Sequence, residues 1–286
     1  MIERIAILGT GLLGTSVGLA LRAAGFRGTI TGWNRSPVGA RVALDLGAID
    51  SIAANPLQAA RESQVVVLAV PIYATLDFME KLAGVLGPEH LVTDVGSTKA
   101  QISAAAARLF NTPERAAFLP GHPMAGKERG GAALGDAALF RGTVWLFTDD
   151  SAAQRSPHSA ELVKGWREWV VAMGAKTIDL APVRHDELVA WGSHLPQFVA
   201  TALSALLQEE VGDAPELRDV GGRALREMTR LGASPYSMWR DIALTNTEAI
   251  QAALLALEQR LAHLRENLRT PELRDEFEKA NRFRRE

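Results

Sequence analysis

The amino-acid sequence predicts a doubly wound α/β sheet followed by an all-α helical domain. Up to Pro182, short β-branched runs alternate with Ala- and Leu-rich stretches, a pattern typical of parallel strands joined by helices. After Pro182, the apolar residues recur at helical spacing only. We therefore predict two domains, residues 1–181 and residues 182–286.

The expected strands of the first domain are short and mostly lack polar alternation, as strands covered on both faces do. Helices are expected where apolar residues recur between these runs. The expected strands are residues 5–8, 28–33, 65–70, 90–94, 117–120, 143–147 and 176–180. The expected helices are residues 12–24, 37–46, 56–62, 74–86, 98–110 and 159–173.

The expected helices of the second domain are 185–211, kinked at Pro196, then 216–230 and 246–269. Thr245 and Glu248 have the spacing of a capping box that would start the last helix. That helix carries an apolar stripe of Ile250, Leu254, Leu257, Leu261, Leu264 and Leu268. The stripe has two interpretations, packing within one core or an interface between subunits. Because a small helical domain is poorly suited to standing alone, a homodimer is preferred. The Arg- and Glu-rich end, 272–286, is expected to fray.

The composition excludes several classes of function. Of the 286 residues, 47% are hydrophobic and 22% charged, which is ordinary for a globular protein. The 31 basic and 33 acidic residues give a net charge of −2, which argues against nucleic acid or an anionic membrane as the main partner. The absence of cysteine excludes disulfides, thiolate ligands and a cysteine nucleophile. We find neither a signal peptide nor a membrane span and expect a cytoplasmic protein.

A glycine-rich turn follows the first expected strand and opens the first helix. Gly9 permits the tight turn, Gly11 lets the backbone approach a pyrophosphate, and Gly14 lets helix and strand pack closely. The helix N-terminus would then face the anion. This pattern predicts a Rossmann-type dinucleotide site. We assign to it Gly9, Thr10, Gly11, Leu12, Leu13 and Gly14, together with Val70 and Pro71 after a neighbouring strand.

The end of the second expected strand bears on the choice of dinucleotide. An acidic residue there would bind a ribose 2′-hydroxyl and repel a 2′-phosphate, but this chain has Asn34, Arg35 and Ser36. Arg35 can pair with a phosphate dianion, and Ser36 can add a hydroxyl donor. NADP is therefore favoured, with NAD as the alternative if Arg35 lies only on a solvated loop.

Two strand ends carry the first catalytic candidates. The segment from Asp94 to Lys99 lies where doubly wound sheets bind their ligands. Within it, Ser97 either caps the helix at 98–110 or points into the site. His122 follows the next strand between a glycine and a proline, in a rigid loop from which a side chain can reach a ligand.

The helical half adds a cluster of arginines. Arg223, Arg226 and Arg230 include pairs spaced by three and four residues, which share one side of a helix. A solvated face is the default interpretation. However, residues 182–286 hold many arginines and one lysine, Lys279, and the planar guanidinium suits carboxylates. A small carboxylate substrate is therefore expected.

The chain resembles the prephenate/arogenate dehydrogenase family of tyrosine biosynthesis from Gly9 to about Asn246. The likeness rests on five segments in the same order, namely Gly9–Gly14, Asp94–Ser97, Gly121–Gly126, Ser193–Pro196, and Thr229-Arg230 leading to Ser234–Asp241. The resemblance implies a Rossmann domain, a helical domain that builds a dimer, and oxidative decarboxylation of a cyclohexadienyl substrate.

The resemblance also implies roles for individual residues. His122 corresponds to the catalytic histidine, Ser97 to the serine that orients it, and Arg230 to the arginine that holds the substrate carboxylate. A histidine suits the base because its ordinary pKa lies near 6.5. The remaining residues implied to line or close the pocket are Glu128, Ser193, His194, Arg226 and Trp239, with His194 counted among the catalytic residues.

One position departs from the family. Many members read Ser-His-Leu-Pro-His, whereas Pro196 is followed here by Gln197. The neutral amide can hydrogen-bond a carboxylate but carries no charge. With NADP use, Gln197 leads us to expect arogenate or dual specificity.

Three other classes of function are alternatives to this one. No metal is expected, because the histidines show no ligand spacing joined to carboxylates and His185-Asp186 is interpreted as a helix start. A β-hydroxyacid dehydrogenase or imine reductase shares the plan, but the hydroxyacid enzymes use a lysine in the second domain, where Lys279 lies too near the end. A non-catalytic NADP-sensing module is the alternative of a different class, and turnover distinguishes it.

Overall fold

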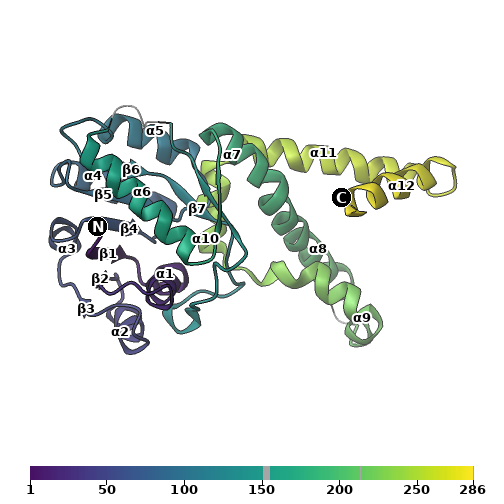
Figure 1. The fold of residues 1–286 in the computed structure, drawn as a ribbon. Helices are drawn as coiled ribbons and strands as arrows, with labels where there is room; N and C mark the ends of the chain where they lie inside the picture. The colour runs from purple at the N-terminus through teal and green to yellow at the C-terminus, as the bar shows by residue number, and fades with distance from the viewer. Residues whose placement is uncertain (151–154, 213, 286) are drawn as a thin grey trace.

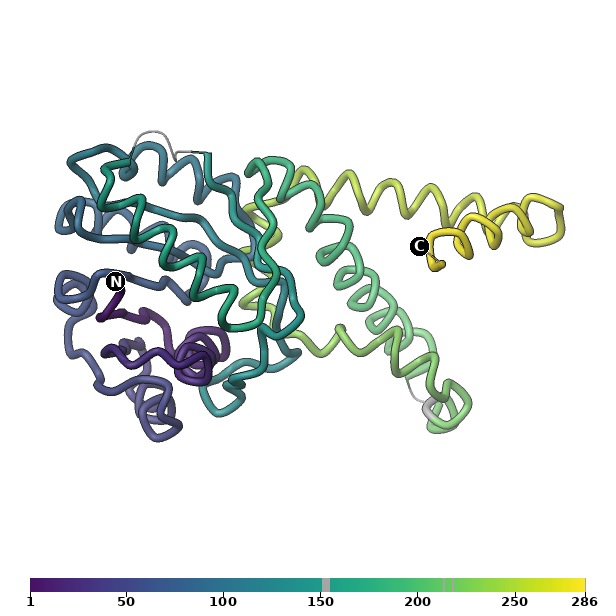
Figure 2. Tube along the Cα trace, viewed as in Figure 1, coloured from purple at the N-terminus to yellow at the C-terminus, as the bar shows by residue number. Residues whose placement is uncertain are grey.

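The computed structural model describes residues 1–150, 155–212 and 214–285, which form a sheet half and a helical half (Figure 1). Helices α8, α9, α11 and α12 extend away from the sheet half, as the chain trace also shows (Figure 2). The strands are β1 (Arg4–Leu8), β2 (Thr29–Trp33), β3 (Ser51–Ile52), β4 (Val65–Leu68), β5 (Leu91–Asp94), β6 (Ala117–Leu119), β7 (Gly121–Pro123), β8 (Val144–Phe147) and β9 (Lys176–Asp179). The α-helices are α1 (Leu12–Ala23), α2 (Pro37–Asp45), α3 (Pro56–Arg61), α4 (Ile72–Ala83), α5 (Ala100–Leu109), α6 (Pro157–Ala172), α7 (Pro182–Val189), α8 (Leu195–Val211), α9 (Glu216–Thr229), α10 (Tyr236–Thr245), α11 (Thr247–Glu266) and α12 (Glu272–Arg285).

The main sheet is parallel and has the strand order β3-β2-β1-β4-β5-β6. Along β1, Ile5 and Ile7 enter a core that α1, α2 and α6 cover. Ala6 and Leu8 enter the opposite core, under α3, α4 and α5. Because successive side chains point to opposite faces, both faces of an apolar strand are buried. The predicted doubly wound sheet is confirmed, and its order reverses between β1 and β4, where such sheets bind ligands.

The last two expected strands do not join this sheet. They form β8 and β9 of a separate three-stranded sheet, in which β7 pairs antiparallel with β8 and β9 pairs parallel with it. Pro120, between β6 and β7, has no N–H to continue a ladder. The chain therefore leaves the parallel sheet there, and His122 lies on the first strand of the second sheet.

The first long helix of the helical half is interrupted before Pro196. A π-helical segment, η3 (Ala190–His194), separates α7 from α8, and Pro196 occupies the first turn of α8, where a proline is tolerated. Segments of this kind often lie at functional sites. Helix α9 is also broken, at Gly222, whose φ of 54° favours glycine.

One expectation for the end of the chain is wrong, and two helices lie where none was predicted. These are α10 (Tyr236–Thr245) and α12 (Glu272–Arg285), the second within the segment expected to fray, with residue 286 outside the described part. The expected capping box does not form, because Thr245 ends α10 and its hydroxyl donates to the Asp241 carbonyl. Helix α11 begins at Thr247 after Asn246.

The apolar stripe of α11 is only partly buried in one chain. Ile250 is buried, Leu254, Leu257 and Leu264 are half-buried, and Leu261 and Leu268 are exposed. Packing within one core therefore accounts for the start of the stripe and not for its end. None of the helices in the described residues is both long and apolar enough to cross a membrane.

Candidate active site

The glycine-rich turn after β1 packs so closely against neighbouring backbone that two of its positions have no room for a side chain. Gly9 has a φ of 103°, and a Cβ there would come within 2.3 Å of the Ala69 carbonyl oxygen. A Cβ on Gly14 would come within 2.0 Å of the Gly9 carbonyl oxygen, so only glycine lets α1 pack on this turn. Gly11 has no heavy atom within 4 Å of an added Cβ, so its backbone faces open space.

Polar atoms at this turn have no partner in the described residues. Thr10 and Thr15 are fully buried, and both hydroxyls lack a hydrogen bond. Leu12 and Leu13 begin α1, whose cap residue Gly11 offers no side-chain bond to the first N–H groups. Such a helix start attracts a phosphate. The turn therefore fits the pyrophosphate of a dinucleotide.

The neighbouring segments extend this cradle. Val70 reaches Gly9, since an added Cβ there would meet a Val70 methyl carbon at 2.7 Å, and Pro71 caps α4 beside it. At the end of β2, Asn34 packs over α2, whereas Arg35 and Ser36 are exposed. Ser36 occupies the cap position of α2 without using its side chain. Both side chains are thus free to contact a ligand at the end of β2.

A buried ion pair organises the loop after β5. Lys99 and Asp94 are fully buried, and the Lys99 Nζ lies 2.5 Å from an Asp94 carboxylate oxygen. That carboxylate also accepts hydrogen bonds from the N–H groups of Gly96 and Gly121. Asp94 therefore ties the loop that bears Ser97 to the start of β7, next to His122.

His122 is hydrogen-bonded to a second histidine from the helical half. Its Nδ1 lies 2.9 Å from Nε2 of His185 on α7, and Nδ1 of His185 lies 2.7 Å from a carboxylate oxygen of Asp186. Asp186 also accepts the N–H groups of Lys99 and Ala100 at 2.7 and 2.8 Å, which caps α5 from the other domain. All these groups are buried or nearly so.

A third histidine lies close to this pair. The ring of His194 meets that of Trp239 edge-on at 5.8 Å, and its Nδ1 lies 3.3 Å from the Asn246 amide nitrogen. The Nε2 of His194 and the indole N–H of Trp239 are buried without a hydrogen-bond partner in the described residues. No group of three or more His, Asp or Glu side chains there is arranged to hold a metal ion.

Burial keeps the three histidines neutral. Burial above all, together with the neighbouring ionisable groups of His185, Lys99 and His194, holds the pKa of His122 well below its usual 6.5. Burial also lowers the pKa of His185, although Asp186 opposes the shift, and it lowers the pKa of His194 to about 4. Burial likewise lowers the pKa of Lys99. His122 is therefore unprotonated at neutral pH, with a lone pair on one ring nitrogen.

The arginine assigned to a carboxylate is accessible. Arg230, at the start of the 3₁₀ turn η4 (Arg230–Ala233), forms an ion pair with Glu128 from the loop after β7. The structure thus brings two predicted pocket residues together across the two halves. Arg226 is exposed on α9, and Ser193 is half-buried in η3.

Gln197 has a different environment from the one we expected. It is buried, and its amide nitrogen donates to the Leu231 carbonyl at 2.7 Å and to Thr201 at 3.1 Å. Its amide oxygen accepts from Ser234 at 3.0 Å. These bonds join α8 to η4, the turn that begins at Arg230. The Gln197 amide could hydrogen-bond a substrate only after these bonds had broken.

Two interpretations from the sequence need correction. Ser97 does not cap α5, because Asp186 does. His185-Asp186 is not a helix start either, since α7 begins at Pro182 and both side chains face the site. Among the described residues, the hydrogen-bond partner found for His122 is His185 rather than Ser97. The adjacent His and Asp were visible in the sequence, but their contact with residues more than 60 positions away was not.

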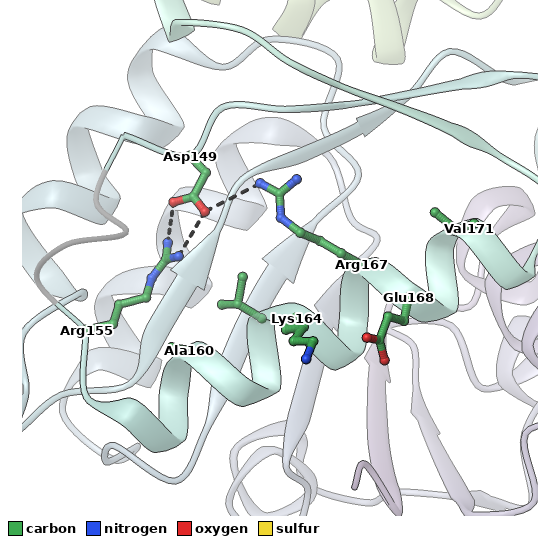
Figure 3. A pocket seen from close by; sticks show the side chains of 8 residues that line it. Asp149, Arg155, Ala160, Lys164, Arg167, Glu168 and Val171 are labelled. Carbon is green, nitrogen blue, oxygen red and sulfur yellow. Dashed lines mark hydrogen bonds and ion pairs between the residues drawn. The ribbon is translucent and has the colours of Figure 1, made fainter.

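A surface hollow of about 510 Å³ lies along α6, apart from the residues predicted for the site (Figure 3). Its charged groups pair with one another, because Asp149 accepts bonds from Arg155 at 2.7 and 2.9 Å and also contacts Arg167. Arg167 lies over the Phe147 ring as well. We assign this region to the packing of α6.

Comparison with known proteins places this architecture in one family. A family model described as the nucleotide-binding domain of prephenate dehydrogenase matches residues 17–178, and one described as its dimerization domain matches residues 181–282. A curated prephenate dehydrogenase of Lactococcus lactis subsp. cremoris is 32% identical over 86% of this chain, which spans 66% of that protein's length. The cyclohexadienyl dehydrogenase of Zymomonas mobilis subsp. mobilis is 30% identical over 88% of this chain and 84% of that protein.

A solved structure supports the same family assignment. Prephenate dehydrogenase from A. aeolicus, in complex with hydroxyphenyl propionate and NAD+, superposes with a TM-score of 0.86 at 28% identity, over 99% of this chain and 98% of that one. The predicted order of a Rossmann-type domain and a helical dimerisation domain is confirmed. The chain belongs to the prephenate dehydrogenase family.

Proposed function

We propose that this chain is an oxidoreductase that uses NAD(P) to convert prephenate, arogenate or both into 4-hydroxyphenylpyruvate or tyrosine, with loss of carbon dioxide. The observation that carries the proposal is His122, a buried neutral histidine on β7, whose neighbour Gly121 is bonded to Asp94 at the carboxyl end of β5. Family membership and the A. aeolicus complex with NAD+ and a hydroxyphenyl ligand support it. Residues 1–181 bind the cofactor and residues 182–286 complete the substrate site.

Each side chain of the site has a separate role in the proposed reaction. A bound nicotinamide supplies the acceptor for the hydride that leaves the ring carbon bearing the 4-hydroxyl. His122 takes the hydroxyl proton through a ring nitrogen. Arg230 holds a substrate carboxylate, and Glu128 is its partner until substrate arrives. The His194 Nε2 and the Trp239 N–H have no partner among the described residues and can offer polar contacts to the substrate. Ser97, Ser193 and Arg226 are assigned to the same pocket by their place in the family motifs.

Substitution of His122 tests the reaction. His122→Asn removes the base and keeps a small polar side chain, so kcat should fall on the order of 10²–10⁴-fold. Steady-state rates on prephenate and arogenate measure the change. An unchanged kcat would overturn the mechanism. A wild-type protein that bound NADP and turned over neither substrate would instead favour a cofactor sensor.

The proposed preference for NADP rests on Arg35 and Ser36 beyond β2. Both are exposed at the start of α2, where the ribose of a dinucleotide is read, and Arg35 forms no salt bridge with a described residue. Arg35→Ala should raise the KM for NADP about tenfold and leave that for NAD nearly unchanged, as expected from the loss of one charge-assisted contact. Equal effects on both cofactors would contradict the assignment.

Substrate choice within the family is the second part of the proposal. Prephenate and arogenate both carry a side-chain carboxylate and differ in the group beside it, which is a keto oxygen or an ammonium. Gln197 is neutral, so this position places no positive charge that would repel the ammonium of arogenate. We therefore infer that the enzyme accepts arogenate, alone or with prephenate. Kinetics on both substrates with both cofactors test this inference, and a far faster turnover of prephenate would contradict it. We also propose a homodimer in the cytoplasm, without nucleic-acid or membrane partners.

A further inference from the structure

His122 is the first member of a buried chain that the proposed reaction does not by itself require. The chain runs from His122 on β7 to His185 on α7 and then to Asp186, with contacts of 2.9 and 2.7 Å. His122 is 7% exposed, His185 0% and Asp186 4%, so water does not compete for these bonds. The chain therefore joins the proposed base to the helical half.

The partners of Asp186 determine where the hydrogen atoms lie. Its two carboxylate oxygens accept the N–H groups of Lys99 and Ala100, which suits an ionised carboxylate that only accepts. The Nδ1 of His185 must then carry a hydrogen and donate it to Asp186. A neutral His185 has one hydrogen, so its Nε2 presents a lone pair.

The same logic extends to His122. Because Nε2 of His185 accepts, Nδ1 of His122 must be the donor across the 2.9 Å contact. A neutral His122 then has a bare Nε2. In this tautomer the lone pair lies on the nitrogen not engaged by His185, where a base needs it.

We propose that His185 and Asp186 are positioning residues that hold His122 in the tautomer whose Nε2 can accept a proton. The proposal rests on the proposed role of His122 as the base. When the substrate O–H bond breaks, its proton forms a bond to Nε2 of His122, and Nδ1 keeps its own hydrogen. The resulting imidazolium is stabilised by the His185 lone pair, which Asp186 supports.

This role differs from simple packing in what it requires of position 185. A packing residue needs volume, whereas the proposed role needs a hydrogen-bond acceptor facing His122. His185→Leu supplies volume without an acceptor. His185→Gln supplies an amide oxygen near the position of Nε2, so it should preserve the tautomer. His90→Leu removes another buried histidine, one that contacts Gly87 and Arg61 in the sheet half, and serves as the matched control.

The first measurement needs neither substrate nor cofactor. In full-length protein labelled with ¹⁵N-histidine, the nitrogen chemical shifts distinguish a nitrogen that carries hydrogen from a bare one. Spectra of His122→Asn identify the signals of His122. We expect hydrogen on Nδ1 in the wild type, in His185→Gln and in His90→Leu, and its partial or complete transfer to Nε2 in His185→Leu.

The second measurement is kinetic. His185→Leu should lower kcat on the order of 10²–10⁴-fold with little change in KM, while His185→Gln stays within about tenfold of wild type. His90→Leu should keep kcat even if it unfolds at a lower temperature. Hydrogen on Nε2 of His122 in the wild type, or an unchanged tautomer and kcat in His185→Leu, would overturn the proposal. If His185→Leu does not fold, His185→Gln provides the test. Transfer of the His122 hydrogen from Nδ1 to Nε2 in that variant, or a loss of its activity, would overturn the proposal. Failure of the proposed function is separate, since it would appear as absent wild-type turnover.

Discussion

The sheet half and the helical half differ in where their large apolar side chains lie. In the sheet half, Trp145 and Trp166 are fully buried, and the central strands have no exposed apolar residue. In the helical half, Leu261 and Leu268 are 57% and 63% exposed, and α12 buries no residue. A chain that encloses one core and leaves another face open is suited to assembly, because apolar patches on a protein surface usually mark an interface. The core of the sheet half is thus closed within one chain, and the helical half is proposed to be completed by a second copy.

The largest contrast should appear when one apolar side chain is removed from each half. Trp166→Ala should lower the free energy of unfolding by about 3–5 kcal/mol, because it leaves a cavity in a closed core. This loss should not depend on protein concentration. The loss from Leu261→Ala should grow with concentration if its partner is another chain. Urea unfolding at several concentrations measures both, and two losses that are equally independent of concentration would remove the distinction.

Acid should lower the stability of the fold through the buried histidines at the boundary between the halves. Because folding lowers the pKa of His194 from 6.5 to about 4, the unfolded chain binds a proton between these values that the folded one does not. Stability is therefore full above pH 6.5 and falls as the pH drops toward 4, by up to about 3 kcal/mol for this histidine. His122 and His185 add to the loss in the same direction, since burial lowers the pKa of each.

The variant His194→Gln isolates the contribution of His194 to this loss of stability in acid. It cannot take up the proton, so its disadvantage relative to wild type should shrink as the pH falls from 6.5 to 4. Urea unfolding of both proteins across this range checks the prediction, and a constant difference would show that His194 does not titrate as its burial predicts.

The smallest expected effect concerns the open face of α11. Leu261→Glu places a charge in the exposed stripe, so the dissociation constant of the proposed dimer should rise at least about tenfold, or about 1.4 kcal/mol. Gln259→Glu adds the same charge on the opposite side of the helix and should change little. Analytical ultracentrifugation of the two variants separates the cases, and identical weakening by both would place the interface elsewhere.

Much of the sheet half could be predicted because its signals are local. The glycine spacing from Gly9 to Gly14 and the apolar runs such as 65–68 depend on neighbours in sequence. In contrast, β7 has three residues and ends in proline, so no local pattern indicates a strand. The capping box at Thr245 failed because the hydroxyl bonds within α10 and also meets Thr98 at 2.7 Å. Tertiary packing overrode the local signal.

The candidate site shows the same limit. His122 and Arg230 were assigned by motif, and the structure adds an identified partner for each, His185 and Glu128. The importance of His185 could not be predicted, since it depends on how α7 docks against β7. Gln197 departs from the family motif in a way that the sequence shows, but its bonds to Leu231 and Ser234 follow from the packing of α8 on η4.

The carboxylate of Asp186 belongs to one domain and closes the first turn of a helix in the other. Because of this one residue, neither half can be replaced by the corresponding half of a relative without regard to the other. A helical domain grafted from a relative onto this sheet must offer a carboxylate to the Lys99 and Ala100 N–H groups, in register with a histidine beside it. A chimera joined near residue 181 without that pair would leave the start of α5 uncapped, so we expect a stable chimera only from donors that carry the pair.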